Sequence, residues 1–231
     1  MKILTKLCFV ILVVTSCKKE NHNKSNALAN TYPIALNTII TPAIIATLQS
    51  HGTVIYNGLT PPVINGIYLL SPAYCTFDNS GENAAGVTFD DYKLQFSNEN
   101  TSAFTISLDF KDVGTGTDTG SDATATYISG TGNSFTVFSQ STGITTGVSN
   151  VRLNIISGIL ESGYIKNFQW STYLVSKGAD PNSVLEPLGS TMIFNDEDGV
   201  SETLSTFSLP GTKIQTVGGE QRGSVLATIH K

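Results

Sequence analysis

The chain has few charged residues. Only 13% of its 231 residues are Asp, Glu, Lys or Arg, and the formal net charge is −5 at pH 7. A mildly acidic surface does not attract phosphate backbones, so nucleic acid and anionic lipid headgroups are not expected partners. Gly, Ser, Thr and Asn are abundant instead, and this composition favours short strands and turns over helices.

The chain also lacks the short motifs that mark common active sites. It has no H-E-x-x-H or paired Cys/His spacing for zinc, no G-x-S-x-G for a nucleophilic serine, and no G-x-x-x-x-G-K-[ST] for a nucleotide phosphate. The mature histidines, His22, His51 and His230, lie far apart in the sequence. We therefore predict no catalytic residues, no metal and no cofactor, in a protein that is not an enzyme.

Cysteine is scarce as well, with only Cys8, Cys17 and Cys75 in the chain. The first two fall in an N-terminal segment that looks like a secretory signal, so Cys75 alone remains for the folded domain. A single cysteine cannot form an intramolecular disulfide. An unpaired thiol in an oxidising compartment is most often a small buried hydrophobe, and we predict this role for Cys75.

The N-terminal segment begins with two early lysines and an apolar run over residues 7–14, which is too short for a spanning helix. Residues 14–17 read Val-Thr-Ser-Cys and resemble the lipobox of bacterial lipoproteins. The resemblance implies cleavage before Cys17 and acylation of its thiol and new amino group by chains such as palmitate. Several acyl chains would make a durable membrane anchor. No later apolar run is long enough to cross a membrane.

These features divide the chain into a signal peptide over 1–16, a lipidated N-terminus with a flexible polar spacer over 17–30, and a single β-rich domain over 31–231. The predicted location is the cell outer membrane. In lipoproteins of the Bacteroidota type, acidic residues just after the cysteine can direct export to the cell surface. Here residues 18–20 are two lysines and one glutamate, so a surface-facing and a periplasm-facing domain both stay open.

One helix is expected, over residues 42–51. Thr41 is a residue type favoured at the N-cap, Pro42 suits the first helical position, and Gly52 is placed for the C-terminal cap. A helix of about three turns is too short to be stable alone and must dock on an apolar surface. Its apolar face contains Ile44, Ile45 and Leu48.

The rest of the domain shows the two-residue period of strands. Residues 92–96 and 104–110 alternate between apolar and polar side chains, as a hairpin with one face in the core requires. About ten such strands with one N-terminal helix predict an all-β fold, an antiparallel barrel or a sandwich. The other expected strands are 54–56, 66–71, 123–129, 135–141, 151 to about 161, 168–174, 192–194, 203–209, 213–217 and 224–230, with loops over 76–90, 112–122 and 178–187.

The stretch over 61–68 reads Pro-Pro-Val-Ile-Asn-Gly-Ile-Tyr and follows the short helix. Together with the lipobox and Lys18-Lys19, this arrangement resembles the uncharacterised outer-membrane lipoproteins of Bacteroidota. More distantly, a turn or helix that leads into Gly-x-aromatic and an antiparallel meander resembles the lipocalin-like barrels. That likeness implies a small apolar ligand inside the barrel.

Five aromatic residues on the predicted strands are candidates for ligand binding. Exposed aromatics can stack on sugars or line an apolar pocket, whereas alternating aromatics on strands are more often core. The sequence does not separate these two interpretations, although core is the commoner one. The candidates are Tyr68, Tyr92, Phe104, Phe168 and Trp170.

The densest acidic cluster, over residues 195–199, contains Asp196 and Asp198 and is a weak calcium candidate. In the EF-hand pattern Phe194 would occupy the first ligand position and Ser205 the bidentate glutamate position, so the pattern fails. Asp-Gly is also a common hairpin turn, and we favour a solvated turn.

The sequence therefore predicts a lipid-anchored, non-enzymatic envelope protein that binds a small apolar or glycan ligand in a β-barrel. The alternative is a structural or assembly lipoprotein that docks on another envelope protein through its loops or a sheet edge. The expected partners are the membrane, through the acyl chains, and either a small ligand or an envelope protein.

Overall fold

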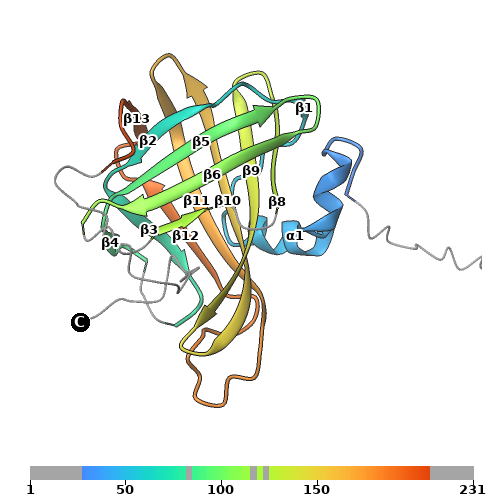
Figure 1. The fold of residues 1–231 in the computed structure, drawn as a ribbon, viewed down its shortest axis with the longest axis vertical. Coiled ribbons are helices and arrows are strands. Elements are labelled where there is room, and N and C mark those ends of the chain that lie inside the picture. Colours follow the sequence, from blue (N-terminus) through green and yellow to red (C-terminus); the bar gives the residue numbers. More distant parts are fainter. Residues whose placement is uncertain (1–27, 82–84, 115–118, 122–124, 209–231) are drawn as a thin grey trace, which may run out of the picture.

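The computed structural model describes residues 28–81, 85–114, 119–121 and 125–208, and it is built mainly from antiparallel strands with one short α-helix (Figure 1). The all-β prediction is therefore confirmed. The signal peptide, Cys17, most of the spacer and the last two predicted strands lie outside the described residues. Within the described ranges, no helix is long and apolar enough to span a membrane.

Thirteen strands form one sheet in this part of the chain. The helical segments are the 3-10 helix η1 (Ile34–Thr38) and α1 (Pro42–Ser50). The strands are β1 (Leu59–Thr60), β2 (Gly66–Leu70), β3 (Ala73–Asp78), β4 (Thr88–Phe89), β5 (Tyr92–Asn100), β6 (Thr105–Asp112), β7 (Thr119–Ser121), β8 (Ala125–Thr131), β9 (Ser134–Thr145), β10 (Val148–Glu161), β11 (Tyr164–Lys177), β12 (Thr191–Asp196) and β13 (Val200–Leu204).

Eight of these strands pair in a closed circuit. The order is β10–β9–β8–β6–β5–β2–β13–β11, and β11 pairs back with β10 along most of its length. Every pairing in the circuit is antiparallel. Between the two architectures that the sequence left open, the hydrogen-bonded circuit is that of a barrel.

The remaining strands extend this circuit. β11 pairs with β13 near its start and with β12 further along, and β12 continues to β3 and β4. β7 pairs with β6, and β1 runs parallel to β8. The described residues form thirteen strands, more than the ten or so that were expected. One reason is that β3 and β4 occupy the two ends of the expected loop over 76–90. The other is that short strands such as β1 and β7 have too few residues to show an alternation.

Strand alternation separates the inner and outer faces as expected. On β6 the buried residues Ile106, Leu108 and Phe110 alternate with less buried polar residues, and β5 pairs with it from Tyr92↔Asp112 onward. This pair confirms the predicted hairpin. Its turn lies over 101–104, slightly later than expected, because β5 continues through the polar residues 97–100.

Helix α1 covers part of the barrel's outer face. The Thr41 hydroxyl accepts a hydrogen bond from the Ile44 N–H at 3.3 Å, and Pro42 is the first helical residue. Gly52 follows the end of the helix at a φ of +104°, in the region that favours glycine. The predicted helix and both of its caps are confirmed. It packs on β8–β11 in a cluster that contains Leu28, Leu36, Ile39, Ile40, Ile45, Leu48, Phe138, Leu153 and Ile155.

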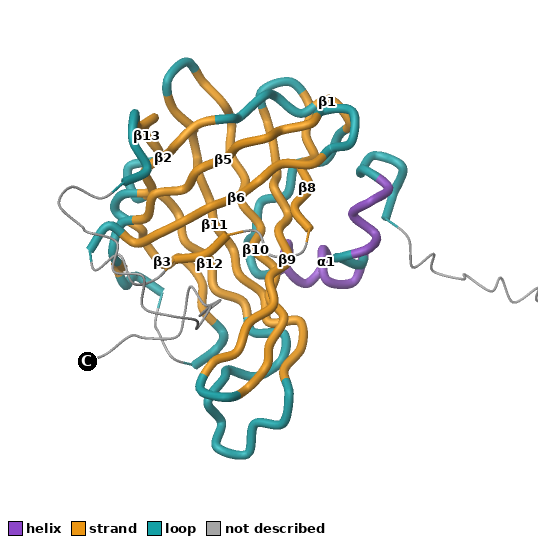
Figure 2. Tube along the Cα trace, viewed as in Figure 1, coloured by secondary structure: helices purple, strands orange, loops and turns teal. Residues whose placement is uncertain are grey.

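The long strands β9, β10 and β11 continue past the end of β8, whose pairing with β9 ends at Ala125↔Gln140 (Figures 1 and 2). We call this extension the arm and define it as residues 141–152 and 173–190, which include the β11–β12 loop. At the bottom of Figure 2 the arm extends beyond the rest of the barrel. A loop folded onto this end can therefore reach the inner face of β10 and β11.

Candidate functional site

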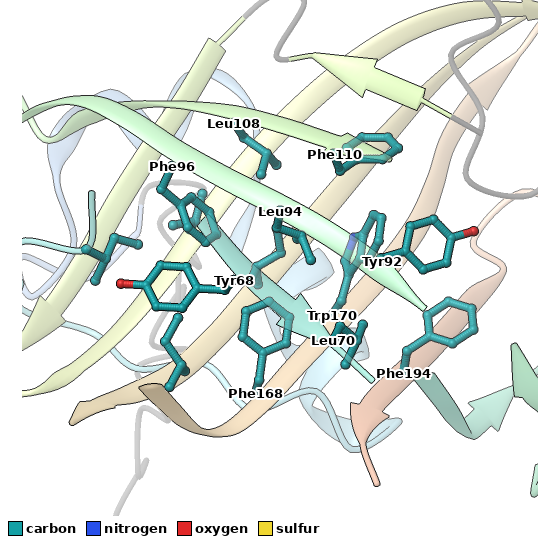
Figure 3. Packing of buried hydrophobic residues seen from close by; sticks show 14 of the residues in the cluster. Tyr68, Leu70, Tyr92, Leu94, Phe96, Leu108, Phe110, Phe168, Trp170 and Phe194 are labelled. Atoms are coloured by element: carbon teal, nitrogen blue, oxygen red, sulfur yellow. The ribbon is translucent and has the colours of Figure 1, made fainter. Parts of the chain in front are cut away.

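The inner face of the barrel carries a cluster of buried aromatic side chains. Four of the five candidate residues, Tyr68, Tyr92, Phe168 and Trp170, belong to it. The ring centroid of Trp170 lies 5.3 Å from that of Tyr92 and 5.1 Å from that of Phe110, in edge-to-face arrangements (Figure 3). Such pairs fill a core efficiently. The structure therefore brings these residues together as packed interior side chains.

Phe104 is not part of this cluster. It precedes β6 in the turn with a φ of +57°, is half-buried, and its carbonyl accepts a hydrogen bond from the Ile128 N–H. The two-residue period placed it on the apolar face of a strand. That placement is wrong because the chain is still turning at this residue and the strand begins only at Thr105.

Other interior aromatics were not among the candidates. Phe96 and Phe110 follow the same alternation as Tyr92 and could have been found from it. Phe135 and Phe194 lie in short apolar runs whose inward face the sequence does not reveal. All four are buried in the interior cluster.

Polar residues line the inner face toward the arm. Asn154 of β10 and Trp170 of β11 are diagonal neighbours across the strand pair, and the indole Nε1–H donates to Asn154 Oδ1 at 3.2 Å. The Thr126 hydroxyl donates to Ser139 Oγ at 3.0 Å between β8 and β9. All of these side chains are buried, as is Thr172, two residues beyond Trp170 on the same face. The interior therefore changes from aromatic to polar along the barrel axis.

An ion pair continues this polar side into the arm. Arg152 lies two residues from Asn154 on the same face of β10, and Glu186 comes from the β11–β12 loop. Arg152 Nη1 pairs with Glu186 Oε1, and Nη2 donates to Oε2 at 2.9 Å. The side chains are only 5% and 8% exposed. The pair is not apparent from the sequence because 34 residues separate its members, and the one local signal is a charged residue between Val151 and Leu153.

Cys75 occupies the interior cluster as a free, buried thiol. Burial raises the pKa of the thiol, and the nearby Asp78 carboxylate raises it further. Both effects disfavour the nucleophilic thiolate. The expected role as a small buried hydrophobe is confirmed.

The acidic cluster at 195–199 forms the turn between β12 and β13. The Gly199 N–H donates to the Asp196 carbonyl, and the Val200 N–H donates to Asp198 Oδ1 at 2.8 Å. Across the described residues, no three or more His, Cys, Asp or Glu side chains are grouped so as to hold a metal ion. The observed hydrogen bonds are those of the predicted turn, which is solvated at Glu197 and Asp198 but not at Asp196, whose side chain is buried.

Asp196 itself is buried at this turn. Its Oδ2 accepts from Ser201 Oγ at 2.5 Å and from the Ser71 N–H at 3.3 Å, and its side chain shares the site with Asp198. Burial is the main cause that raises the pKa of Asp196 from 3.8 to about 6, and the Asp198 carboxylate adds to it. The surroundings of Asp196 therefore favour its neutral form over its ionised form.

This raised pKa predicts a pH-dependent stability. Because the pKa of Asp196 is higher in the folded than in the unfolded chain, its contribution is present below pH 3.8 and is lost as the pH rises through about 6. Asp196→Asn removes this loss. As the pH rises from 4 to 7.5, we expect the stability of the variant relative to the wild type to increase by about 1–2 kcal/mol. This is less than the full linkage value of about 3 kcal/mol because the neighbouring residues Glu197 and Asp198 are exposed and let solvent screen the site. Urea unfolding at both pH values measures it, and an equal difference at both would contradict it.

Comparisons with protein-family models, curated proteins and solved structures found no match to this chain. The class of protein is therefore defined by the fold and the interior alone. It is an all-β protein whose strand pairings close into an antiparallel barrel, with an aromatic interior that becomes polar toward the arm.

Proposed function

We propose that this protein is a lipid-anchored envelope protein that binds a small ligand in the polar end of its barrel, without catalysing a reaction. The observation that carries the proposal is the polar set around Asn154 and Arg152, which adjoins the aromatic side chains on the inner face. A concave apolar surface with a few convergent polar groups is the usual composition of a small-molecule site.

The energetic cost of this polar set supports a ligand-binding role. Burying amides and hydroxyls is unfavourable unless each finds a hydrogen-bond partner, and a buried ion pair often adds no more stability than apolar side chains of the same volume. A barrel that needed only a stable core would be served by apolar residues at Asn154 and Arg152. The aromatic side would contact the apolar or ring-shaped part of a ligand, and the polar side would orient it.

Native mass spectrometry of the protein purified gently from the envelope tests this proposal. We expect a reproducible extra mass that disappears on extraction with organic solvent, and its identity would give the class of ligand. A bare mass, together with an unchanged thermal midpoint across a broad panel of lipids and glycans, would count against a ligand in the barrel.

The membrane anchor is a separate part of the proposal and has its own test. Cys17 supplies the only thiol at the lipobox-like boundary. Cys17→Ser is expected to abolish labelling by a radioactive or clickable fatty acid and to release the chain from the membrane fraction. Cys75→Ser is the matched control and should keep both label and membrane association. Retention of both by the Cys17 variant would refute the anchor.

Docking on another envelope protein is the second candidate. It is favoured by two exposed apolar side chains of the arm, Ile144 at 61% and Leu188 at 59% exposure. Cross-linking in whole cells separates the two functions. A stoichiometric protein partner that is lost in an Ile144→Lys, Leu188→Lys variant would favour docking, whereas the absence of any partner would favour the ligand.

A further inference from the structure

The β11–β12 loop places a carboxylate and an apolar side chain side by side on the inner face of the arm. Glu186 pairs with Arg152 through both of its oxygens. Its neighbour Leu185 packs in a cluster with Val148 of β10 and Leu174 of β11. Of these two adjacent loop residues, Glu186 therefore places a carboxylate and Leu185 an apolar side chain next to the polar interior.

The loop is built to present these two side chains. Asp180 Oδ1 accepts from the Val184 N–H at 2.7 Å and its Oδ2 from the Leu185 N–H at 3.1 Å. Lys177 Nζ donates to the Leu185 carbonyl at 3.0 Å and pairs with Asp180 at 2.8 Å. These contacts form within residues 177–185, so they can persist if Glu186 alone leaves Arg152.

Arg152 retains capacity for a ligand. Among the described residues its Nε has no hydrogen-bond partner, although the side chain is buried. Leaving a buried donor unpaired is costly. The guanidinium offers a planar fork that matches carboxylate and phosphate oxygens, and this geometry is occupied here by the carboxylate of the loop.

We propose that the side chain of Glu186 occupies a ligand subsite on Arg152 and that a small amphiphile with an anionic head, a carboxylate or a phosphate, displaces it. The head would take the place of Glu186 on Arg152, and the apolar body would pack on the adjacent cluster of Leu185, Val148 and Leu174. This inference rests on the proposed function, because it assigns a ligand class to the same end of the barrel.

Binding of three eight-carbon probes to the full chain tests the inference. The probes are octanoate, octyl phosphate and uncharged 1-octanol, and the emission of Trp170, the only tryptophan, reports binding. We expect the wild type to prefer an anionic probe over octanol, and the two anions show whether carboxylate or phosphate is favoured. Glu186→Gln removes the carboxylate that competes with the probe for Arg152. The variant should bind that anion about tenfold more tightly, because Arg152 is free to bind it in a larger fraction of the molecules.

The variant that removes the fork completes the test. Arg152→Met/Glu186→Leu keeps apolar volume at both positions, so it should fold and should lose the preference for an anionic probe over octanol. Equal binding of octanol and both anions to the wild type and this variant would overturn the inference and leave the proposed function standing. If no probe binds, the inference is overturned. If native mass spectrometry then also shows the protein without any bound ligand, the proposed function is refuted as well.

Discussion

Trp170→Ala is expected to lower the free energy of unfolding by about 4 kcal/mol, in the range seen when a large buried aromatic side chain is removed. The side chain is 1% exposed and contacts Tyr92, Phe110 and Phe194. Alanine leaves a cavity between these rings. It also removes the indole N–H that donates to Asn154, so a buried amide oxygen loses its partner.

Urea unfolding followed by far-ultraviolet circular dichroism measures this loss, because the variant has no tryptophan to report fluorescence. Trp170→Phe is the matched variant: it retains most of the ring packing but not the N–H donor, and a loss of about 1–2 kcal/mol is expected for it. Equal losses in the two variants would mean that the hydrogen bond, rather than the packing, is responsible. A loss below 1 kcal/mol for alanine would contradict the buried position of the ring.

The elements with a strong local signal could be predicted from the sequence. The helix at 42–50 has both of its caps in the sequence, at Thr41 and Gly52, and needed no tertiary information. The β5–β6 hairpin alternates clearly because its outer face is polar. β10 was expected from residue 151 to about 161, and its end is where the sequence places it, but it begins three residues earlier and spans Val148–Glu161. Its inner and outer faces are both buried, one by the barrel and one by α1, so apolar residues occur on both and the period does not show which face is inside.

The aromatic candidates illustrate a second limit. Tyr92 and Trp170 lie 78 residues apart, and only the barrel's closure brings their rings into contact. The sequence could show that each points to an apolar face, but not whether those faces meet. The polar interior was missed for the same reason. Asn154 and Arg152 look like ordinary polar positions of a strand until the alternation of β10 is fixed by its neighbours on both sides.

Glu186→Gln is the second large effect, an expected loss of about 3 kcal/mol in the free energy of unfolding at neutral pH. Removing one member of a buried ion pair leaves the other charge without compensation, and such changes typically cost 3–5 kcal/mol. Arg152 is buried on β10, which β9 and β11 flank, and among the described residues Glu186 is the only partner of its guanidinium, so the charge stays buried when the carboxylate is removed. The neutral amide of glutamine retains one acceptor oxygen and offsets a small part of this cost.

Two control variants show whether the loss of stability comes from the unpaired charge of Arg152 or from removing any glutamate. Glu202→Gln alters an exposed glutamate of β13 and should change stability by less than about 0.5 kcal/mol. Arg152→Met/Glu186→Leu removes both charges and should recover most of the loss, because apolar residues of similar volume replace a buried pair without penalty. If the single variant is as stable as the wild type, the loop does not hold Glu186 on Arg152 in solution. If the double variant is as unstable as the single one, packing of the loop rather than the unpaired charge accounts for the loss.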